Sequence, residues 1–368
     1  MREGWEYKKL GELCTSISDG SHNPPKGIDH SLYRMISSQN VFDDNLQITE
    51  DNVRYITESD HLCENKRTKL QKDVVLLTIV GTIGRSCVLK GNEGCLTLQR
   101  SVAALHPSDQ IMPRYLMHCL IGNRHTLNQE AHGIAQKGIY LKQLSSLSIP
   151  LPPKSTQLAI VSELDKINEL IRLKKEQLKD FDNLAQSLFY EMFGDPVENE
   201  MGWEVKKLGE VYKMKSGDSL STKSFEEGDI PVYGGNGISG YHNQYNKDGS
   251  YIIIGRVGVY CGNVRIVKGR FWLTDNAFEL LYDNSSQNEV FVCSLLTHLN
   301  LRQYANAAAQ PVISNNTLKH VSIPLPPLPL QQLFAHRIEQ IEHQKAEVQK
   351  SITDLETLLA SRMQYWFE

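Results

Sequence analysis

The chain has 368 residues, of which 40% are hydrophobic and 22% are charged, and its formal net charge is −4 at pH 7. These values are typical of a folded protein with two or three domains, and they exclude bulk disorder. The negative net charge gives no global electrostatic case for nucleic-acid binding, so such binding would need local basic patches.

No apolar run approaches the length that a membrane span requires, and the first residues lack the basic start and apolar core of a signal peptide. We therefore expect a cytoplasmic protein without membrane contact. The seven cysteines are odd in number and form no Cys-x-x-Cys pair, which argues against both a zinc site and a disulfide framework. We expect reduced, mostly buried thiols and no metal.

In chain order, the first recognisable feature is a nine-residue segment that occurs twice. The sequence GWEYKKLGE at residues 4–12 returns as GWEVKKLGE at residues 202–210, an offset of 198 (202 − 4). The hexapeptide SIPLPP at 148–153 returns at 322–327, with an offset of 174 (322 − 148). The chain is therefore an internal duplication, and its first copy holds 24 residues (198 − 174) that the second lacks.

The offset also locates these extra residues. GTIG at residues 81–84 resembles GRVG at residues 255–258, and this pair is already offset by 174 (255 − 81). The extra residues are therefore expected between Leu13 and Gly81.

Each globular segment between the repeated motifs is predicted to contain short strands, many turns and little long helix. The β-branched runs Val74–Val80 and Tyr251–Ile254, bounded by glycine, predict buried strands. Pro113–Leu120 and Glu289–Leu299 predict short helices. A strand-rich domain with polar, glycine-containing loops is a scaffold that can present contacts to a ligand.

Each SIPLPP hexapeptide opens a run whose apolar residues are spaced alternately four and three apart, the period of a coiled-coil seam. The seam positions are Ile160, Leu164, Ile167, Ile171, Lys174, Leu178, Phe181, Ala185, Leu188 and Met192 in the first copy and Phe334, Ile338, Ile341, Lys345, Val348, Ile352, Leu355, Leu359, Arg362 and Trp366 in the second. The lysine in each seam is expected to set register. Neither helix has a second apolar stripe wide enough to enter a large core, so we expect the two to pair with each other.

Catalytic motifs are mostly absent. GNGISG at 235–240 has the letters of a dinucleotide-binding loop, but no amphipathic helix follows to receive a pyrophosphate. NPPK at 23–26 resembles the motif of adenine-N6 DNA methyltransferases, yet Lys26 occupies the position of the base-stacking aromatic ring. No zinc-binding histidine spacing and no Walker loop is present.

The order of the repeated motifs resembles the specificity subunit of type I restriction-modification enzymes, over essentially the whole chain. The resemblance rests on the two WExKKLGE openings, the two SIPLPP hinges with Gln157 and Gln331, and the pairs Ala135-Gln136 and Ala309-Gln310. It implies an α+β fold with two pseudo-symmetric, strand-rich α/β target recognition domains joined by a long antiparallel two-helix coiled coil. The domains are predicted at 1–153 and 197–327, and the spacer helices at 154–196 and 328–368.

The resemblance also implies a function. Such a subunit is not catalytic by itself; each domain reads half of an asymmetric, bipartite site in double-stranded DNA, and the helices dock two modification (methyltransferase) subunits. S-adenosylmethionine, ATP and magnesium are expected in partner subunits rather than in this chain, and an ATP-driven restriction (translocase/nuclease) subunit is a further possible partner. A dyad between the copies would also place residues 1–10 near the end of the second helix.

Candidate DNA-binding residues combine side chains that read base edges with hydroxyls that hold phosphate. They are Ser21, His22, Ser38, Asn40, Thr82, Arg85, Gln99, Arg100, Gln136 and Lys137 in the first domain, and Ser219, Tyr233, Asn236, Tyr241, Arg256, Asn276 and Gln310 in the second. Each also has a plain alternative as a turn residue, a loop-backbone partner or a solvated charge.

Candidate partner-binding residues are the aromatic side chains at the two helix ends, where one antiparallel pair would leave apolar surface uncovered. They are Tyr190, Phe193, Tyr365, Trp366 and Phe367. Two other functions remain open on the sequence alone. The chain could be a self-contained restriction or methylation enzyme, or a coiled-coil scaffold protein that assembles without DNA binding.

Overall fold

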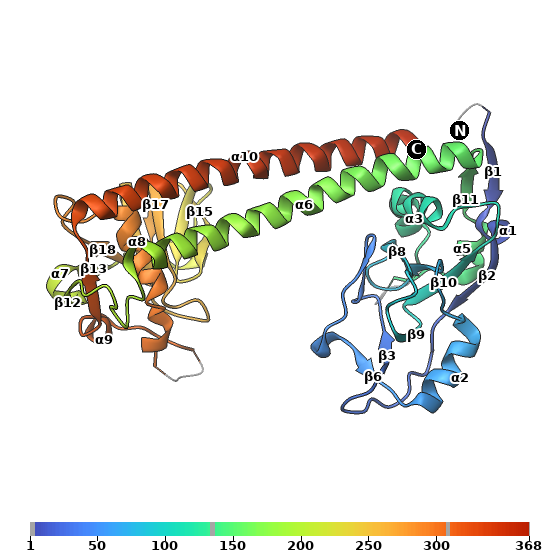
Figure 1. Ribbon diagram of the computed structural model, residues 1–368, viewed down its shortest axis with the longest axis horizontal. Helices are drawn as coiled ribbons and strands as arrows, with labels where there is room; N and C mark the ends of the chain where they lie inside the picture. Colours follow the sequence, from blue (N-terminus) through green and yellow to red (C-terminus); the bar gives the residue numbers. More distant parts are fainter. Residues whose placement is uncertain (1–3, 133–136, 307–309, 368) are drawn as a thin grey trace. The chain divides into compact units, whose positions relative to one another are not determined.

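The computed structural model describes residues 4–132, 137–306 and 310–367 and divides into two compact units. Unit 1 consists of Met1–Lys174 with Ser351–Glu368, and unit 2 consists of Lys175–Lys350. Each unit therefore combines one globular segment with one half of each long helix (Figure 1). This division cuts through the helices, and the predicted domain boundaries stay a prediction.

The main sheet of unit 1 has four antiparallel strands in the order β2-β10-β7-β8. Their bounds are β2 (Cys14–Asp19), β10 (Val102–Pro107), β7 (Val75–Thr78) and β8 (Ser86–Val88). Successive side chains of β7 alternate between two cores: Val75 and Leu77 face the core that contains the helices, whereas Leu76 faces the second core. Burial on both faces explains the continuous apolar run in this segment.

A three-stranded sheet covers the second core of unit 1. Its order is β6-β3-β9, with β3 and β9 parallel. The bounds are β3 (Tyr33–Ile36), β6 (Arg54–Tyr55) and β9 (Cys95–Leu98), and a hairpin is formed by β4 (Val41–Phe42) and β5 (Asn45–Leu46). The helices are α1 (Leu10–Leu13), η1 (Glu50–Asn52), α2 (Glu58–Thr68), α3 (Pro113–Gly122), α4 (Arg124–Gln129) and α5 (Leu141–Ser146).

Unit 2 contains a six-stranded sheet in the order β13-β18-β16-β17-β14-β15, in which β14 and β17 are parallel. The strands are β13 (Lys213–Ser216), β14 (Ile230–Gly234), β15 (Gly237–His242), β16 (Lys247–Gly255), β17 (Val264–Leu273) and β18 (Ala277–Leu281). The helices are α7 (Leu208–Val211), η2 (Thr222–Ser224), α8 (Glu289–His298), η3 (Leu301–Tyr304) and α9 (Asn315–Leu318).

The repeated motifs have the same structure in both units. The WExKKLGE openings form β1 (Glu6–Lys9) and β12 (Glu204–Lys207). The SIPLPP hinges form β11 (Ser148–Leu151) and β19 (Ser322–Leu325), which pair antiparallel with β1 and β12 respectively. Each opening strand therefore pairs with the hinge strand of its own copy.

One buried glutamine fixes each hinge. In unit 1, Gln157 accepts a hydrogen bond from the Met112 amide (2.9 Å) and donates one to the Pro152 carbonyl (3.0 Å). In unit 2, Gln331 does the same with the Asn288 amide (2.9 Å) and the Pro326 carbonyl (2.8 Å). Both glutamines are 1% exposed, so these bonds satisfy polar groups that water cannot reach.

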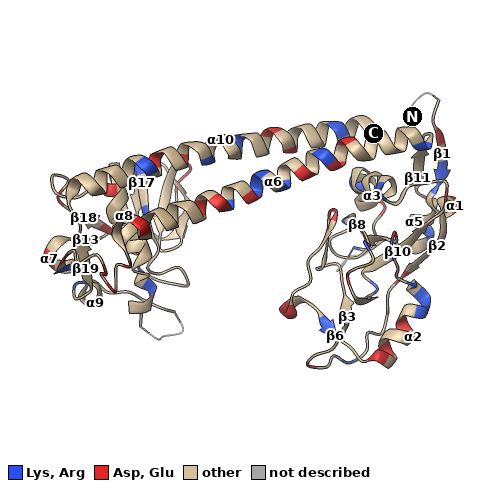
Figure 2. Cartoon of the chain, in the orientation of Figure 1, with Lys and Arg blue, Asp and Glu red and all other residues tan. Residues whose placement is uncertain are grey.

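The hinges lead into two helices of 40 residues each, α6 (Lys154–Phe193) and α10 (Leu328–Phe367). Within unit 1, Glu163 on α6 pairs with Arg362 on α10; within unit 2, Asp182 pairs with Lys345 at 2.8 Å. The partner number falls as the α6 number rises, so the helices are antiparallel. Basic and acidic residues alternate along both helices (Figure 2).

The predicted seam is confirmed. Its buried members include Ile160, Leu164, Ile167, Ile171, Phe334, Ile341, Val348 and Ile352. The expectation that the helices lack a further apolar stripe is wrong, however. Val161 joins the core of unit 1, and Phe189 and Phe193 join the core of unit 2, because the helix ends are packed into the globular segments.

The fold class predicted from the sequence is confirmed, as are the strands β7 and β16 and the helices α3 and α8. The sequence analysis missed α2, which lies inside the region predicted to hold the extra residues of the first copy. All seven cysteines are free, and Cys63 and Cys95 are exposed rather than buried. None of the helices that the structure describes has the length and apolar character that a membrane span requires.

Candidate nucleic-acid interface

Several loops of unit 1 meet where the strands of its two sheets end, on one side of the unit. The strands β2, β3, β7 and β9 all end on this side, and β10 begins there, because Val102 pairs with Thr78, Ala103 with Asp19, and Ile36 with Leu98. Four segments that follow or precede these strands, residues 20–22, 37–40, 79–85 and 99–101, make up what we call the loop edge of unit 1. Residues 137–138 join it through a bridge between Gly138 and Val80.

Backbone hydrogen bonds hold the loop edge together. The Ser21 amide donates to the Leu98 carbonyl (2.8 Å), and the Arg100 amide donates to the Ser21 carbonyl (3.0 Å). The Gln99 amide donates to the Ile36 carbonyl (2.9 Å). The structure therefore brings together segments of the sequence that lie some 80 residues apart, and it fixes the backbone from which their side chains project.

A glycine allows this close approach. A Cβ on Gly20 would lie 2.1 Å from the Leu98 carbonyl oxygen, which is too close for any side chain. Gly217 of unit 2 has the same constraint, with 2.3 Å to the Leu273 carbonyl oxygen. These glycines serve contact between backbones rather than a positive φ, and they mark equivalent positions in the two units.

Most of the residues predicted for the first domain lie on the loop edge. His22, Thr82, Arg100 and Lys137 are exposed there, and Ser38, Arg85 and Gln99 are half-buried. Ser21 is 6% exposed. Gln136 lies outside the described residues. DNA contact by these residues stays a prediction.

Asn40 is the exception, and its selection is corrected. It is 0% exposed. Its side-chain oxygen accepts from the Ser37 amide (2.9 Å), while its side-chain nitrogen donates to the carbonyls of Gln47 (3.2 Å) and Asn52 (3.0 Å). Asn40 therefore stabilises the loop from inside and cannot reach a base.

Sequence analysis also missed the groups that set the local charge. Asp19, at the end of β2, is 7% exposed and pairs with Arg67 of α2 and with His22, the latter at 2.7 Å. The Arg85 guanidinium lies over the Phe42 ring, 4.7 Å from its centroid. No spacing in the sequence pairs residue 19 with residue 67, so this ion pair could not be predicted.

Unit 2 has a corresponding set of segments, residues 217–218, 233–236, 256–258 and 274–276, which we call the loop edge of unit 2. The Asp218 amide donates to the Leu273 carbonyl (2.9 Å), and the Thr274 amide donates to the Tyr233 carbonyl (2.9 Å). The turn between β14 and β15 approaches this edge, because a Cβ on Gly235 would lie 2.6 Å from the Val257 carbonyl oxygen. The segment that has the letters of a dinucleotide loop, residues 235–240, consists of this turn and the first residues of β15, so it continues into a strand and not into a helix.

The residues predicted for the second domain are only partly brought together. Asn236, Asn276 and Gln310 are exposed at or beside the loop edge of unit 2, and Tyr233 is half-buried there. Ser219 is exposed just beyond it. Tyr241 is 55% exposed but lies at the other end of β15, where it pairs with Pro231.

Arg256 is held by its neighbours. Its guanidinium lies over Phe278 (5.3 Å to the centroid) and donates to the Ser216 hydroxyl (3.5 Å) and the Asp275 carbonyl (3.4 Å). Its Nε is buried and has no hydrogen-bond partner within the described part of the chain. This donor is therefore left unsatisfied inside the unit and is not presented on the surface.

The prediction of uncovered aromatic surface is wrong for Phe193. It is 2% exposed in the core of unit 2, and its ring centroid lies 4.8 Å from that of Phe291 and 5.2 Å from that of Phe334. Tyr190, on the same helical turn, is 39% exposed. Of these two predicted residues, the tyrosine is the exposed one.

The end of α10 is similarly covered within unit 1. Trp366 stacks on Trp5, with 6.2 Å between ring centroids, and Phe367 packs against Tyr115 at 5.9 Å. The expected proximity of the first residues to the end of the second helix is thereby confirmed. Tyr365 is 54% exposed. Partner binding by these residues stays a prediction, with only the two tyrosines well exposed.

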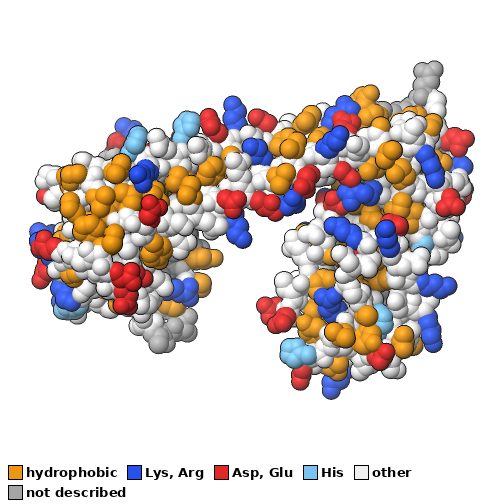
Figure 3. Space-filling view, in the orientation of Figure 1, with side chains coloured by type: hydrophobic (Ala, Val, Ile, Leu, Met, Phe, Trp, Pro, Cys, Tyr) orange, Lys and Arg blue, Asp and Glu red, His pale blue; other side chains and the backbone are white. Residues whose placement is uncertain are grey.

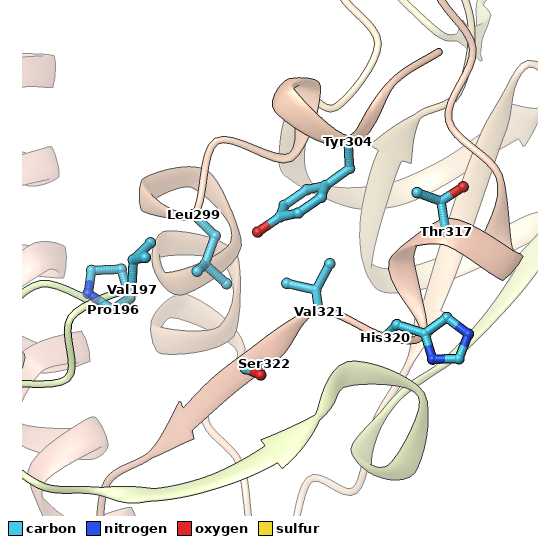
Figure 4. Close-up of a pocket in the computed structure, with 8 residues that line it drawn as sticks. All are labelled: Pro196, Val197, Leu299, Tyr304, Thr317, His320, Val321 and Ser322. Carbon is cyan, nitrogen blue, oxygen red and sulfur yellow. The ribbon is translucent and has the colours of Figure 1, made fainter.

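The surface of both units carries charged side chains of both signs (Figure 3), and unit 2 has a pocket. On the face shown in Figure 3, acidic and basic side chains are mixed on each unit. A pocket of about 420 Å³ in unit 2 is lined mainly by apolar groups such as Pro196, Val197, Leu299 and Val321, with Tyr304 turned toward them (Figure 4). Among the residues that can be placed, no group of His, Cys, Asp or Glu could hold a metal ion.

Comparison with known proteins identifies the family. The model of the type I restriction modification DNA specificity domain matches twice, at residues 2–180 and 200–357. The EcoprrI specificity subunit of Escherichia coli is 32% identical over 169 residues, which are 45% of this chain and 41% of that protein. The putative MjaX specificity subunit of Methanocaldococcus jannaschii is 23% identical over 92% of this chain and 87% of its own length.

Solved structures agree on the fold. The S subunit of a type I restriction-modification system from M. genitalium matches with a TM-score of 0.60 at 16% identity, over 99% of this chain and 96% of that one. A chain from a study of complex assembly in the type I R-M system matches with a TM-score of 0.61 at 18% identity, over 100% and 98% of the two chains. With two copies of the family domain, each closed by a hinge and a helix, the chain belongs to the type I restriction-modification DNA specificity family.

Proposed function

We propose that this chain is the DNA-reading, non-catalytic subunit of a type I restriction-modification complex and binds an asymmetric, bipartite site in double-stranded DNA. The observation that carries the proposal is the loop edge, which unit 1 and unit 2 build with the same backbone hydrogen bonds and different side chains. A repeated scaffold with divergent side chains suits two related but unequal recognition tasks. A scaffold protein without DNA binding has no need of such an edge.

The duplication accounts for two half-sites. In proteins that bind DNA as symmetric dimers, the protein symmetry fixes the spacing of the half-sites. Here the repeat is covalent, and its two copies differ in sequence. The half-sites should therefore differ too, while the two 40-residue helices fix the gap between them.

Affinity is expected to be modest for the isolated chain. The net charge is −4, and the exposed cations of the unit 1 loop edge are few, chiefly Arg100 and Lys137. Each phosphate contact releases counterions and contributes a salt-dependent increment of affinity. Much of the phosphate binding would then come from the modification subunits.

The catalytic chemistry is assigned to partner subunits. We place S-adenosylmethionine in two modification subunits, and ATP and magnesium in a restriction subunit where one is present. Tyr190 and Tyr365 are the exposed aromatic residues that could contact modification subunits at the helix ends. This assignment places the complex in the cytoplasm, where its DNA is found.

Selection from a random DNA library tests the proposal. The chain would be purified with its modification subunit, and bound duplexes would be sequenced after several rounds. Enrichment of two short blocks separated by a fixed gap is expected. Enrichment of one block would contradict the bipartite reading, and enrichment of none by a complex shown to be assembled would favour a scaffold.

A matched pair of variants separates DNA reading from assembly. Arg85→Glu with Arg100→Glu reverses two charges on the loop edge of unit 1 without altering a core. We expect loss of DNA retention with unchanged co-purification of the modification subunit, whereas a scaffold would keep every measurable function. Reversal of two exposed charges that are not among the loop-edge residues, Lys142→Glu with Lys154→Glu, is the control.

A further inference from the structure

The two loop edges can be aligned residue by residue through their hydrogen bonds. The Ser21 amide bonds to the Leu98 carbonyl as the Asp218 amide bonds to the Leu273 carbonyl, at 2.8 and 2.9 Å. The amide of Gly20 bonds to the Val102 carbonyl, and that of Gly217 to the Ala277 carbonyl, both at 3.2 Å. Each acceptor residue of unit 2 is therefore numbered 175 higher than the equivalent acceptor of unit 1 (273 − 98, and 277 − 102).

Two further bonds fix the residues between these anchors. The Val102 amide bonds to the Gln99 carbonyl (3.0 Å), and the Ala277 amide bonds to the Thr274 carbonyl (3.1 Å). Residues 99–102 of unit 1 therefore follow the same path as residues 274–277 of unit 2. Arg100 is thereby equivalent to Asp275.

This structural alignment also corrects the sequence match of Gly81 to Gly255. The Gly81 amide bonds to the Lys137 carbonyl as the Gly258 amide bonds to the Pro311 carbonyl, at 3.3 and 3.0 Å. Gly81 and Gly258 also share a positive φ of 81° and 86°. The offset at this point is therefore 177 (258 − 81) rather than 174.

The equivalent pair carries opposite charges on the same backbone. Arg100 is exposed and Asp275 is half-buried. Within residues 4–132, 137–306 and 310–367, neither the Arg100 guanidinium nor the Asp275 carboxylate forms an ion pair or hydrogen bond. The contact between Arg256 and Asp275 involves only the backbone carbonyl of Asp275.

We propose that Arg100 and Asp275 are specificity-determining residues at corresponding positions of the two half-sites, with Arg100 selecting guanine and Asp275 selecting cytosine. The inference rests on the proposed function and names the bases that this site takes. A guanidinium donates two hydrogen bonds to O6 and N7 of guanine, which no other base presents together in the major groove. A carboxylate accepts from the N4 amino group of cytosine.

Asp275 favours cytosine over adenine for an electrostatic reason. Adenine also presents an amino group, but its N7 acceptor lies beside it and would repel a carboxylate. Cytosine presents only the donor. Because guanine and cytosine pair with each other, both units would read a G·C base pair, unit 1 through its guanine and unit 2 through its cytosine.

Two substitutions that replace a charged group by an amide test the assignment of the bases. Asparagine and glutamine both recognise adenine through N6 and N7. Asp275→Asn should therefore change one position of one half-site from cytosine to adenine. Arg100→Gln should change one position of the other half-site from guanine to adenine. For each variant we expect the enrichment of the original base, relative to adenine at that position, to fall roughly 10-fold or more.

The test is library selection with the full chain in complex with its modification subunit, comparing wild type with Arg100→Gln and Asp275→Asn. Lys137→Gln is the control, since a phosphate contact should weaken all sequences equally and leave the motif unchanged. Thermal melting of each complex checks that the fold is retained.

Every outcome decides between the alternatives. A base change confined to one position, in a different half-site for each variant, supports the proposal. Unchanged motifs, or a uniform loss of binding by a folded complex, would overturn it because the two side chains would then contact phosphate or nothing. If wild type itself enriches no bipartite motif, the proposed function fails as well, and that failure is visible before any variant is compared.

Discussion

Buried polar side chains are the residues whose role is clearest in both copies. Gln157 and Gln331 each link the hinge to the start of a short helix, and both are shielded from water. The sequence showed that the two glutamines recur at matching positions, but not what they bind. Their partners lie 45 and 43 residues away in the chain, and no local pattern indicates such a contact.

Gln157→Ala is predicted to loosen only the hinge of unit 1. The Met112 amide would lose its acceptor in a buried site, at a cost of about 1–3 kcal/mol. Hydrogen exchange should accelerate at Met112 and leave the equivalent Asn288 amide unchanged. Gln331→Ala should give the reverse pattern, so each copy is the control for the other. Equal acceleration in both units would contradict the assignment.

Asp165 on α6 makes a pH-dependent contribution to the stability of unit 1. Burial alone would raise its pKa, but hydrogen bonds from His118 (2.8 Å) and Arg114 (2.6 Å) outweigh that effect and lower the pKa below its usual range. Arg114 also forms two bonds of 2.9 Å to Asp44, so the cluster ties α6 and α3 to the β4–β5 hairpin.

The sign of the pH dependence follows from this shift. A carboxyl with a depressed pKa in the folded chain stabilises it above the unfolded-state pKa of about 3.9, and that stabilisation is lost as the pH falls through the lower folded-state value. Asp165→Asn should therefore destabilise unit 1 at neutral pH, by about 1–3 kcal/mol, and flatten its loss of stability below pH 4. Denaturant unfolding at a series of pH values measures both, and an unchanged slope would exclude the role.

At the scale of elements, the long helices could be predicted almost completely. Their seam positions follow from a period that the sequence shows directly, and the structure confirms them. The packing of their ends could not be predicted, because Phe189 and Phe193 lie outside the helix seam and pack on the globular core of unit 2. A seam pattern records contact between helices, whereas these residues contact a domain whose shape depends on distant strands.

Lys345 tests the energetics of the seam. Its side chain is 24% exposed and pairs with Asp182 (2.8 Å) and Glu342 (2.9 Å). Ion pairs at this exposure contribute about 0–1 kcal/mol, whereas burying part of a leucine contributes about 1–2 kcal/mol. Lys345→Leu should therefore slow hydrogen exchange in the surrounding turns of α10, and the exposed Lys350→Leu should have little effect. Faster exchange in the Lys345 variant would show that the ion pairs outweigh apolar packing.

At the scale of the whole molecule, the chain is a duplication in which the opening strands, the hinges and several loop-edge hydrogen bonds recur, while the sheets and many side chains differ. The sequence was sufficient to predict two copies, the hinges and the fold class. It could not align the recognition loops, because matching glycines placed Gly81 against Gly255, while hydrogen bonds place it against Gly258. Surface loops tolerate insertions and substitutions better than packed strands and helices do, so sequence similarity aligns them poorly.

The central claim is that this chain directs modification to an asymmetric, bipartite DNA site. Mapping N6-methyladenine across the genome of cells that express the chain with and without its modification subunit tests this most directly. We expect methylation at one motif of two short blocks with a fixed gap, dependent on both proteins. An unchanged methylation pattern, with both proteins shown to be expressed and assembled and the modification subunit shown to be active, would contradict it.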